Sequence, residues 1–276
     1  MVDLVTSESG PDVPQSRPRF SVVTITRNDL VGLQSTWDSL RVQTNGAFEW
    51  VVVDGASTDD TVDWLASLDE PRLVWRSESD SGIYDAMNKG MSQATGDLIV
   101  FMNGGDRFAS PDVLETVRCD QENFGWDWAY GASRIVDPDG SVVGFHVQAP
   151  FSLANLRFGL RGIPHQAAYF TRSLTEAIGG YDASFGIAGD QEFMLRAALL
   201  AEPHVIGEIL AEFLSGGVSY GGRADRFVHE TRQMRKRHDL LVGGNEVVDV
   251  LVTGLLSSER RARHLAASIA RRTPKE

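Results

Sequence analysis

SESDSGIYDAMNKG, at residues 77–90, follows a short apolar run and opens a helix. Two acidic turns flank it in the sequence, VVVDGAS at residues 51–57 and FMNGGD at residues 101–106. Three times, therefore, a strand of buried character ends near an aspartate within a turn of small residues. An open α/β sheet presents carboxylates to a ligand in this way, at the carboxyl ends of its strands. The pattern predicts a site for a polar, phosphorylated small molecule.

Apolar runs alternate with helical periodicity through the amino-terminal half. FSVVTIT, at residues 20–26, is typical of a buried parallel strand, and apolar residues at helical spacing follow it. This βα alternation predicts a doubly wound sheet with right-handed crossovers. Strands are expected at 20–26, 49–54, 72–76 and 98–102, and helices at 30–42, 57–68 and 84–93.

The pattern changes after Asp106. DPDG, at residues 137–140, is a strong hairpin turn and predicts antiparallel strands added to one side of the sheet. The glycine-dense segment 215–222 is expected to be a mobile loop. In this half, strands are expected at 128–136, 141–145 and 166–171, and helices at 111–117, 174–178, 190–201, 227–241 and 247–269.

Length and composition indicate one large domain with two appended segments. The 276 residues suffice for one α/β core. We expect a disordered lead-in at 1–19, a main domain at 20–222 and a helical, basic extension at 223–276. The lead-in lacks the apolar core of a signal peptide, and no run approaches the ~20 apolar residues that a membrane-spanning helix needs. With Cys119 as the single cysteine, an internal disulfide is excluded and a reducing, cytoplasmic compartment is expected.

The net charge of −12 is unevenly distributed. Residues 223–276 hold 12 Lys and Arg against 7 Asp and Glu, so this extension carries +5 and the preceding chain −17. An acidic body excludes nucleic acid as the main partner. The basic extension predicts peripheral contact with anionic lipid at the inner face of the plasma membrane. A solvated helical surface, packing on the body and a homodimer contact are the open alternatives.

Six segments, in this order and spacing, resemble the motifs of family 2 glycosyltransferases. The resemblance covers residues 20–219 and implies the GT-A fold, an α/β doubly wound mixed sheet with helices on both faces, here with a small helical C-terminal extension. It implies that residues 20–106 bind a nucleotide sugar and that residues 107–222 bind the acceptor. The segments are SVVTITRN (21–28), VDGASTD (53–59), DSGIYDAMNKG (80–90), ATGD (94–97), PHQA (164–167) and GDQEF (189–193).

The same resemblance implies a set of donor-binding residues. Asp54 would accept an N–H from a uracil, thymine or guanine ring, and Asp80 would meet ribose or base donors. Each has a plainer alternative, as a helix cap for Asp54 and as ordinary loop chemistry for Asp80. Thr26 and Asn28 would shape the base pocket, Asn88 and Lys89 would face the diphosphate, and His165 would lie near the donor sugar. For Lys89 the alternative is an exposed lysine, and for His165 it is a buried histidine in the wall.

Asp106 is the metal candidate. A Mg²⁺ or Mn²⁺ ion held by carboxylate and phosphate oxygens stabilises a departing diphosphate. The Asp-x-Asp of the family is here Asn103-Gly104-Gly105, with Asp106 one place later. Metal dependence is therefore an open question, and a turn aspartate that binds only backbone groups is the alternative.

Asp190 is the candidate base. In an inverting transfer, one carboxylate takes the proton of the acceptor hydroxyl while its oxygen attacks the anomeric carbon. Asp190 occupies the catalytic position of the family at a helix start, where the dipole favours the ionised form. An N-cap role is the alternative, and Glu192 is the lesser candidate.

These assignments predict an inverting glycosyltransferase. The donor would be a UDP, GDP or dTDP sugar, and the acceptor a glycan or lipid-linked hydroxyl in cell-envelope polysaccharide or glycolipid synthesis. Two alternatives remain. The first is a non-catalytic nucleotide- or glycan-binding module, because Asp-x-Asp is missing. The second is a sugar-phosphate nucleotidyltransferase, which the absence of glycine between Thr26 and Gly32 disfavours. The loop at 216–222, with Ser219 and Arg223, is a candidate lid. Three tryptophans are candidates for sugar stacking, with core packing expected for at least two: Trp50, Trp126 and Trp128.

Overall fold

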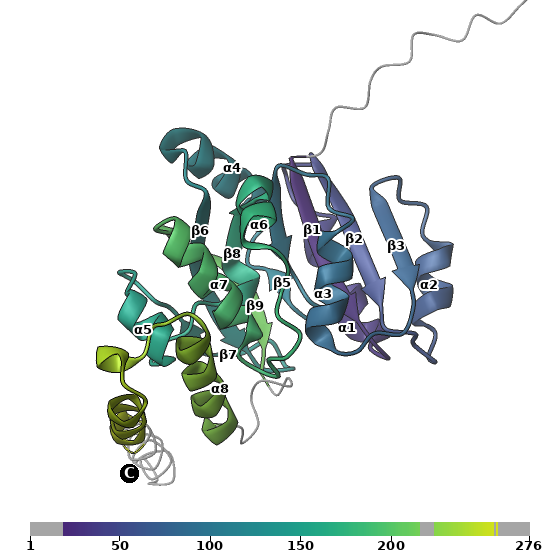
Figure 1. The fold of residues 1–276 in the computed structure, drawn as a ribbon. Helices are drawn as coiled ribbons and strands as arrows, with labels where there is room; N and C mark the ends of the chain where they lie inside the picture. The colour runs from purple at the N-terminus through teal and green to yellow at the C-terminus, as the bar shows by residue number, and fades with distance from the viewer. Residues whose placement is uncertain (1–18, 216–223, 257, 259–276) are drawn as a thin grey trace, which may run out of the picture.

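The computed structural model describes residues 19–215, 224–256 and 258. A single mixed sheet runs through these residues, with the strand order β3-β2-β1-β4-β8-β6-β9-β5 and with β7 paired to β6 (Figure 1). The expected α/β mixed sheet is therefore confirmed. Its strands are β1 (Phe20–Thr26), β2 (Phe48–Asp54), β3 (Leu73–Ser77), β4 (Leu98–Phe101), β5 (Arg107–Phe108), β6 (Trp128–Val136), β7 (Val142–His146), β8 (Ala168–Thr171) and β9 (His204–Leu214).

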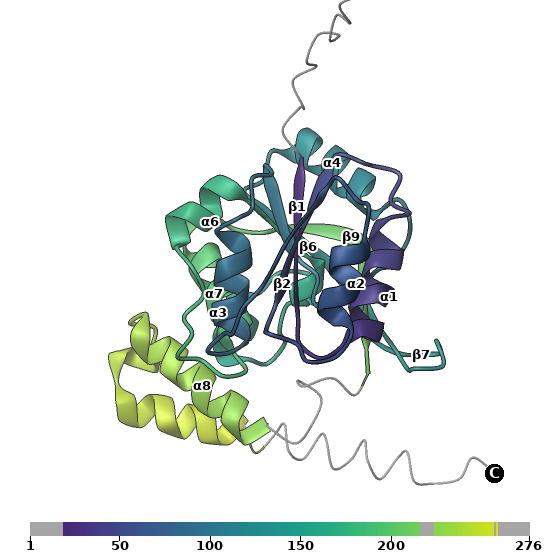
Figure 2. The same cartoon turned by 90° about the vertical axis from the view of Figure 1, so that its right-hand side faces the viewer.

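Strands β1 to β4 form the parallel part of the sheet. Both β1 and β2 are buried along almost their whole length because helices cover both faces of the sheet here. In Figure 2, α3, α6 and α7 lie on one face, and α1, α2 and α4 on the other. The helices are α1 (Leu30–Leu40), α2 (Thr61–Ser67), α3 (Ile83–Met91), α4 (Val113–Phe124), α5 (Leu153–Phe158), α6 (Arg172–Ile178), α7 (Gly189–Leu200) and α8 (Ala224–Arg237).

The carboxyl-terminal half departs further from expectation. The strand expected at 166–171 is a 3₁₀ turn, His165–Ala167, followed by β8, which pairs antiparallel with both β4 and β6. The longest strand, β9, was not expected, and it pairs parallel with β6 through a register that shifts twice. The helix expected at 111–117 instead continues to Phe124, where Gly125, at φ 65°, ends it. Helix α5 was also not expected.

Each face of the sheet has its own apolar core. The core under α1, α2 and α4 includes Trp50, which stacks on Trp37 at 4.8 Å between ring centroids. The core under α3, α6 and α7 includes Trp128, which is fully buried and donates to the carbonyl of Ala201. Trp126 is 7% exposed. Sugar stacking is therefore wrong for all three tryptophans, because their rings lie inside the protein.

The C-terminal extension packs on the body through α8 and a further helix at 246–256. Helix α8 lies beside α5 at the lower end of the view in Figure 1. Arg235 of α8 is fully buried and forms a bidentate ion pair with Asp249, with N···O distances of 2.9 and 3.0 Å. None of the helices in the described part of the chain is long and apolar enough to span a bilayer. The expected lead-in and the candidate lid at 216–222 lie outside the described residues.

Candidate active site

The carboxyl ends of the parallel strands gather the expected donor-binding residues. Strand β1 lies between β2 and β4, so the direction of strand addition reverses at β1. Open α/β sheets bind ligands in the crevice at such a reversal. Thr26 and Asp54 are register partners at the ends of β1 and β2, and Asp54 is also paired with Ser77 at the end of β3. Asn28 and Asp80 follow on the adjoining loops.

Asp54 is fully buried and its carboxylate organises the turn after β2. It accepts hydrogen bonds from the backbone N–H of Ser57 at 2.9 Å and from the hydroxyl of Ser77 at 2.6 Å. The hydroxyl of Ser57 is a third donor. An ionised carboxylate has about four acceptor sites, and these three donors occupy most of them. The nucleobase contact of Asp54 stays a prediction, and its turn-forming role is an observed fact.

Asn28 joins the loop after β1 to the loop after β2. It has a φ of 51°, a left-handed conformation that asparagine tolerates better than most residues. Its side-chain oxygen accepts from the backbone N–H of Thr58 at 2.7 Å, and its own N–H donates to the Ser57 hydroxyl at 2.7 Å. The hydroxyl of Thr26 is buried beside this loop and has no partner within the described residues. An unpaired buried hydroxyl is a candidate ligand contact.

Asp80 approaches the same turn from the loop after β3. One carboxylate oxygen accepts from the backbone N–H of Gly82 at 3.0 Å. The other lies so close to Gly55 that a Cβ there would come within 2.6 Å of it, and within 3.2 Å of the Arg27 side chain. Gly55 thus leaves room over the turn for the side chains of both Asp80 and Arg27. Arg27 was not singled out from the sequence, although its position directly after β1 was a usable signal.

Asn88 and Lys89, the expected diphosphate residues, have other partners. The amide of Asn88 both donates to the backbone carbonyl and accepts from the backbone N–H of Tyr181, at 2.9 and 2.6 Å. Lys89 donates to the carbonyl of Ser79 at 2.8 Å and lies 3.3 Å from carboxylates of Glu78 and Asp85. Their contact with a diphosphate stays a prediction, and it requires new partners for both side chains.

Asp106, after β4, is a buried carboxyl on a turn held by backbone bonds. Burial raises its pKa to about 7, partly offset by a hydrogen bond from the backbone of Asn103. The side-chain oxygen of Asn103 is also buried and has no partner within the described residues. Carboxylate and amide oxygens suit Mg²⁺ or Mn²⁺, and a cation would favour the ionised form of Asp106. The two residues therefore fit part of a metal site, although no group of three or more acidic, histidine or cysteine side chains forms one in the described chain.

Asp190 is the second residue of α7, so it is not the N-cap, which is Ala188. Its carboxylate accepts from the backbone and side chain of Gln191, at 2.8 and 3.2 Å. Burial raises its pKa to about 6, hydrogen bonds from Gln191 oppose the rise, and the charge of Glu230 adds to it. A carboxylate with this pKa is ionised at neutral pH and is a stronger base than an ordinary aspartate.

Tyr84 connects the strand-end loops to Asp190. Its hydroxyl accepts from the backbone N–H groups of Gly189 and Asp190, at 3.0 and 3.3 Å. Its ring stacks on Tyr181, at 5.6 Å between centroids. Tyr84 was not predicted as a site residue, although it lies within the stretch 77–90. Its role joins α3, in the amino-terminal half, to the start of α7.

His165 lies in the wall behind this contact. Its Nε2 is 2.7 Å from the hydroxyl of Tyr181, and its ring stacks on Phe101 at 5.2 Å. Burial lowers its pKa to about 4, so the imidazole is neutral at physiological pH. A donor-sugar contact stays a prediction. The expected partners Ser219 and Arg223 lie outside the described residues.

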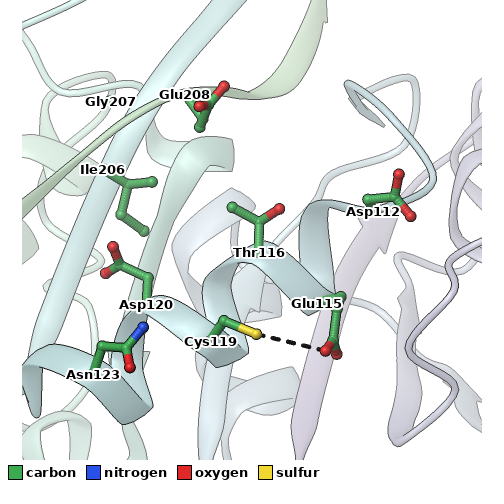
Figure 3. A pocket seen from close by; sticks show the side chains of 9 residues that line it. All are labelled: Asp112, Glu115, Thr116, Cys119, Asp120, Asn123, Ile206, Gly207 and Glu208. Atoms are coloured by element: carbon green, nitrogen blue, oxygen red, sulfur yellow. Dashed lines mark hydrogen bonds between the residues drawn. The ribbon is translucent and has the colours of Figure 1, made fainter.

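The expected site residues thus lie in two places, the strand ends and the start of α7. Thr26, Asn28, Asp54 and Asp80 meet at the strand ends, and Tyr84 and the aromatic wall connect this edge to Asp190. A separate open hollow of about 540 Å³ lies between α4 and β9 (Figure 3). It carries Asp112, Glu115, Asp120 and Glu208 and contains none of the expected residues.

Comparisons with known proteins agree with these motifs. Residues 21–144 match the sequence profile described as glycosyl transferase family 2. An uncharacterized glycosyltransferase of Mycobacterium tuberculosis is 43% identical over 227 residues, which are 81% of this chain and 85% of that protein. A PGL/p-HBAD biosynthesis glycosyltransferase of Mycobacterium bovis is 32% identical over 216 residues, covering 76% of this chain and 81% of the relative.

Solved structures share the fold at lower identity. Staphylococcus aureus TarS 1–349 in complex with UDP-GlcNAc superposes with a TM-score of 0.65 at 20% identity, over 80% of this chain and 66% of that one. This chain thus spans just under two thirds of TarS 1–349. A mannosyltransferase from Pyrobaculum calidifontis, in complex with GDP-Man and Mn²⁺, gives a TM-score of 0.61 at 21% identity, over 95% and 78% of the two chains.

Proposed function

This chain belongs to glycosyltransferase family 2 and has the GT-A fold, and we propose that it transfers a sugar, with inversion, from a nucleoside diphosphate sugar to a hydroxyl acceptor. The observation that carries the proposal is Asp190, a carboxylate at the start of α7 whose backbone N–H is bound by Tyr84 of α3 and whose pKa burial raises to about 6. Membership in this family sets aside the nucleotidyltransferase and the non-catalytic module.

The donor is assigned to the strand-end group. Asp54 offers its remaining acceptor site to a nucleobase N–H, and Thr26 and Asn28 line the same pocket. Asp80 accepts from the ribose, with Arg27 beside it. UDP-GlcNAc in TarS and GDP-Man in the Pyrobaculum enzyme support a UDP or GDP sugar, and dTDP remains a third option. Roles for Asn88, Lys89 and His165 belong to the same proposal and depend on the rearrangements stated above.

Transfer then requires one base. Asp190 accepts the proton of the acceptor hydroxyl while that oxygen forms a bond to the anomeric carbon. The bond from this carbon to the diphosphate breaks on the opposite face, and the electron pair leaves with the diphosphate. The hydrogen bonds from Gln191 hold the carboxylate in place during the step.

Asp106 and Asn103 would hold a divalent cation on the diphosphate side. Mg²⁺ or Mn²⁺ bound there would supply charge stabilisation to the leaving group. The Mn²⁺ in the Pyrobaculum mannosyltransferase supports this assignment. Asp106→Asn should then abolish a Mn²⁺-dependent rise in melting temperature seen with nucleotide, whereas Asp112→Asn, an exposed aspartate on the next helix, should leave it unchanged. A rise preserved in Asp106→Asn would place the metal elsewhere.

The acceptor is proposed to be a glycan or lipid-linked hydroxyl of the cell envelope. The PGL/p-HBAD biosynthesis relative supports the lipid-linked option. The helix at 246–256 turns Asp249 inward and leaves Val247, Leu251 and Leu255 outward, 69%, 64% and 72% exposed. The chain beyond it contains Arg260, and the arginines 261 and 263. Exposed apolar residues followed by cations favour an anionic bilayer as their partner.

Vesicle co-sedimentation tests this contact. The protein should bind phosphatidylglycerol vesicles and not phosphatidylcholine vesicles, and a double variant, Leu251→Ser with Leu255→Ser, should lose binding. Leu200→Ser, at 62% exposure on α7, is the control. If the double variant binds vesicles as the wild type does, this surface is not the membrane contact. If the double substitution dissociates a dimer, the surface is a dimer interface.

A thermal-shift screen with UDP, GDP, dTDP, CDP and AMP, with and without Mn²⁺, tests the donor class. A ligand that binds the native state raises the melting temperature by mass action. One of the first three diphosphates should stabilise the protein, and more strongly with Mn²⁺. No shift with any nucleotide would contradict the proposal.

A further inference from the structure

Three consecutive backbone N–H groups just before α7 converge on a single carboxylate oxygen. Oε2 of Glu230 accepts from Gly186 at 3.1 Å, from Ile187 at 2.8 Å and from Ala188 at 2.9 Å. Glu230 belongs to α8, in the C-terminal extension, and is 5% exposed. The extension thus reaches the segment that leads into the helix of Asp190.

One of these contacts, to the N–H of Ala188, acts as a helix cap, and the other two hold the segment just before the helix. The first N–H groups of a helix lack partners within it, and a capping side chain normally supplies them. The N-cap residue of α7 is Ala188, which has no polar side chain. Glu230 binds the N–H of this residue and of the two before it. A Cβ on Gly186 would lie 1.7 Å from the Arg226 guanidinium, so a larger residue there would displace the end of this arginine side chain.

Two distant elements therefore hold the start of α7 from different sides. Glu230 of α8 binds residues 186–188, and the hydroxyl of Tyr84 in α3 accepts from Gly189 and Asp190. Five successive N–H groups are bound in this way. The backbone of Asp190 is fixed between the donor half and the C-terminal extension.

The groups around Asp190 are mostly neutral. Tyr84 on α3 and Tyr181 on the preceding loop are buried phenols whose pKa is raised by burial first and by Asp190 second. His165, bonded to Tyr181, is a neutral imidazole, and Gln191 is the polar neighbour on α7 itself. Glu192, also on α7, is paired with Arg196 and His238. Glu230 is the charged group that acts on Asp190 from α8.

Glu230 itself stays ionised near neutral pH. Burial acts to raise its pKa, but hydrogen bonds from the 186–188 backbone and from Arg226 outweigh burial and lower it. Arg226 binds the other oxygen, Oε1, at 2.7 Å and is itself 57% exposed. A negative charge therefore persists beside the start of α7.

We propose that Glu230 is a positioning residue for sugar transfer: from the C-terminal extension it fixes the segment that leads into α7, and with it the backbone of Asp190. The proposal rests on the proposed role of Asp190 as the base. It makes the extension part of the catalytic apparatus in addition to any membrane contact.

Glu230→Gln is the sharpest variant, because the amide oxygen still accepts hydrogen bonds while the charge is lost. The matched control is Glu246→Gln, which removes a glutamate of the same extension that pairs with Lys236 and does not touch α7. The assay is hydrolysis of UDP-GlcNAc, GDP-Man or dTDP-glucose, with water as acceptor. Donor dissociation constants should be unchanged in both variants. The acid midpoint of kcat/KM should move to lower pH by a few tenths of a unit in Glu230→Gln alone.

An NMR titration of the Asp190 carboxyl carbon, assigned with Asp190→Asn, gives the same midpoint without turnover. It should fall in Glu230→Gln and not in the control. Glu230→Ala removes the acceptor as well, so amide exchange of residues 186–190 should accelerate, and kcat should fall about 10-fold or more. An unshifted midpoint and unchanged exchange in folded Glu230 variants would overturn this proposal alone. Normal hydrolysis by Asp190→Asn would instead overturn the proposed base.

Discussion

Asp54 is a buried carboxylate at the end of β2 and Asp190 a partly buried one at the start of α7, and the contacts that hold the two residues in place differ in sequence distance. Asp54 is bound by Ser57, three residues away, and by Ser77, 23 residues away on the adjoining strand. Asp190 has its backbone held by Tyr84, 106 residues earlier, and by way of the preceding segment by Glu230 on α8. The donor edge is therefore built from local turns, whereas the base depends on tertiary contacts. Mutations in the two halves should consequently fail in different ways.

The largest effect is expected for Asp190→Asn. Loss of a general base costs about 10²- to 10⁴-fold in turnover, and the strand-end loops should bind nucleotide as before. Stopped assays of donor hydrolysis, with calorimetric nucleotide binding, measure the two quantities separately. Glu192→Gln is the control on the same helix, and it should lose stability while keeping turnover. Near-normal turnover of Asp190→Asn would mean that the base lies elsewhere.

Asp54→Asn should produce the opposite separation. Its amide cannot accept all three serine hydrogen bonds, which costs about 1–3 kcal/mol, and donor binding should weaken about 10- to 100-fold. The turnover of bound donor should change little. Asp59→Asn, on the same loop but exposed, should behave like the wild type in nucleotide calorimetry. Unchanged donor affinity in Asp54→Asn would leave Asp54 with only its turn-forming role.

The pH dependence of activity should separate the two halves, because it follows one group of the carboxyl-terminal half. The folded-state pKa of Asp190 is raised to about 6, so its protonated, inactive form is populated below that pH. Activity should rise with pH and reach half its plateau near pH 6, and at pH 5 it should be about tenfold lower. Nucleotide binding measured without a divalent cation should stay constant between pH 5.5 and 8, because Asp106, whose pKa is raised to about 7, would act on it through the metal. An activity midpoint near 4 would indicate a base with an ordinary carboxyl pKa.

Tyr84→Phe should give the smallest effect, because it loosens the link between the halves without removing a group that takes part in the proposed reaction. Two backbone N–H groups lose their acceptor, which lowers stability by about 1–3 kcal/mol. Turnover should fall by a few-fold, about 1 kcal/mol in the barrier, and donor affinity should hold. Tyr130→Phe, whose hydroxyl donates to the Gln148 carbonyl, is the control for loss of a buried phenol. A wild-type rate in folded Tyr84→Phe would mean that Glu230 alone positions Asp190.

The same contrast explains what the sequence could predict. Strands β1, β2 and β4 were placed to within one residue because their residues are predominantly apolar and turns with aspartate or asparagine follow them. Strand β9 was missed because Gly207, Glu208 and Glu212 interrupt its apolar pattern, and its pairing with β6 is non-local. Local sequence specifies local geometry, and long-range pairing overrides it.

Site residues follow the same rule. Asp54, Asn28 and Asp80 could be predicted to meet, because adjacent parallel strands bring their ends together. No local pattern could show that the Asn88 amide binds the backbone of Tyr181, 93 residues away. Glu230 carried no signal either, since a glutamate in a charged helix is ordinarily a solvated residue.

The buried pair of Arg235 and Asp249 decides how this enzyme can be trimmed or recombined. A chain cut between α8 and the helix at 246–256 would leave the Arg235 guanidinium buried without its counter-ion, at a cost of about 3–5 kcal/mol. Helix α8 would then lose its packing against α5, and Glu230 would lose its contacts with the start of α7. Chimaeras that exchange extensions between related enzymes should therefore keep α8 and the following helix as one unit with the catalytic half.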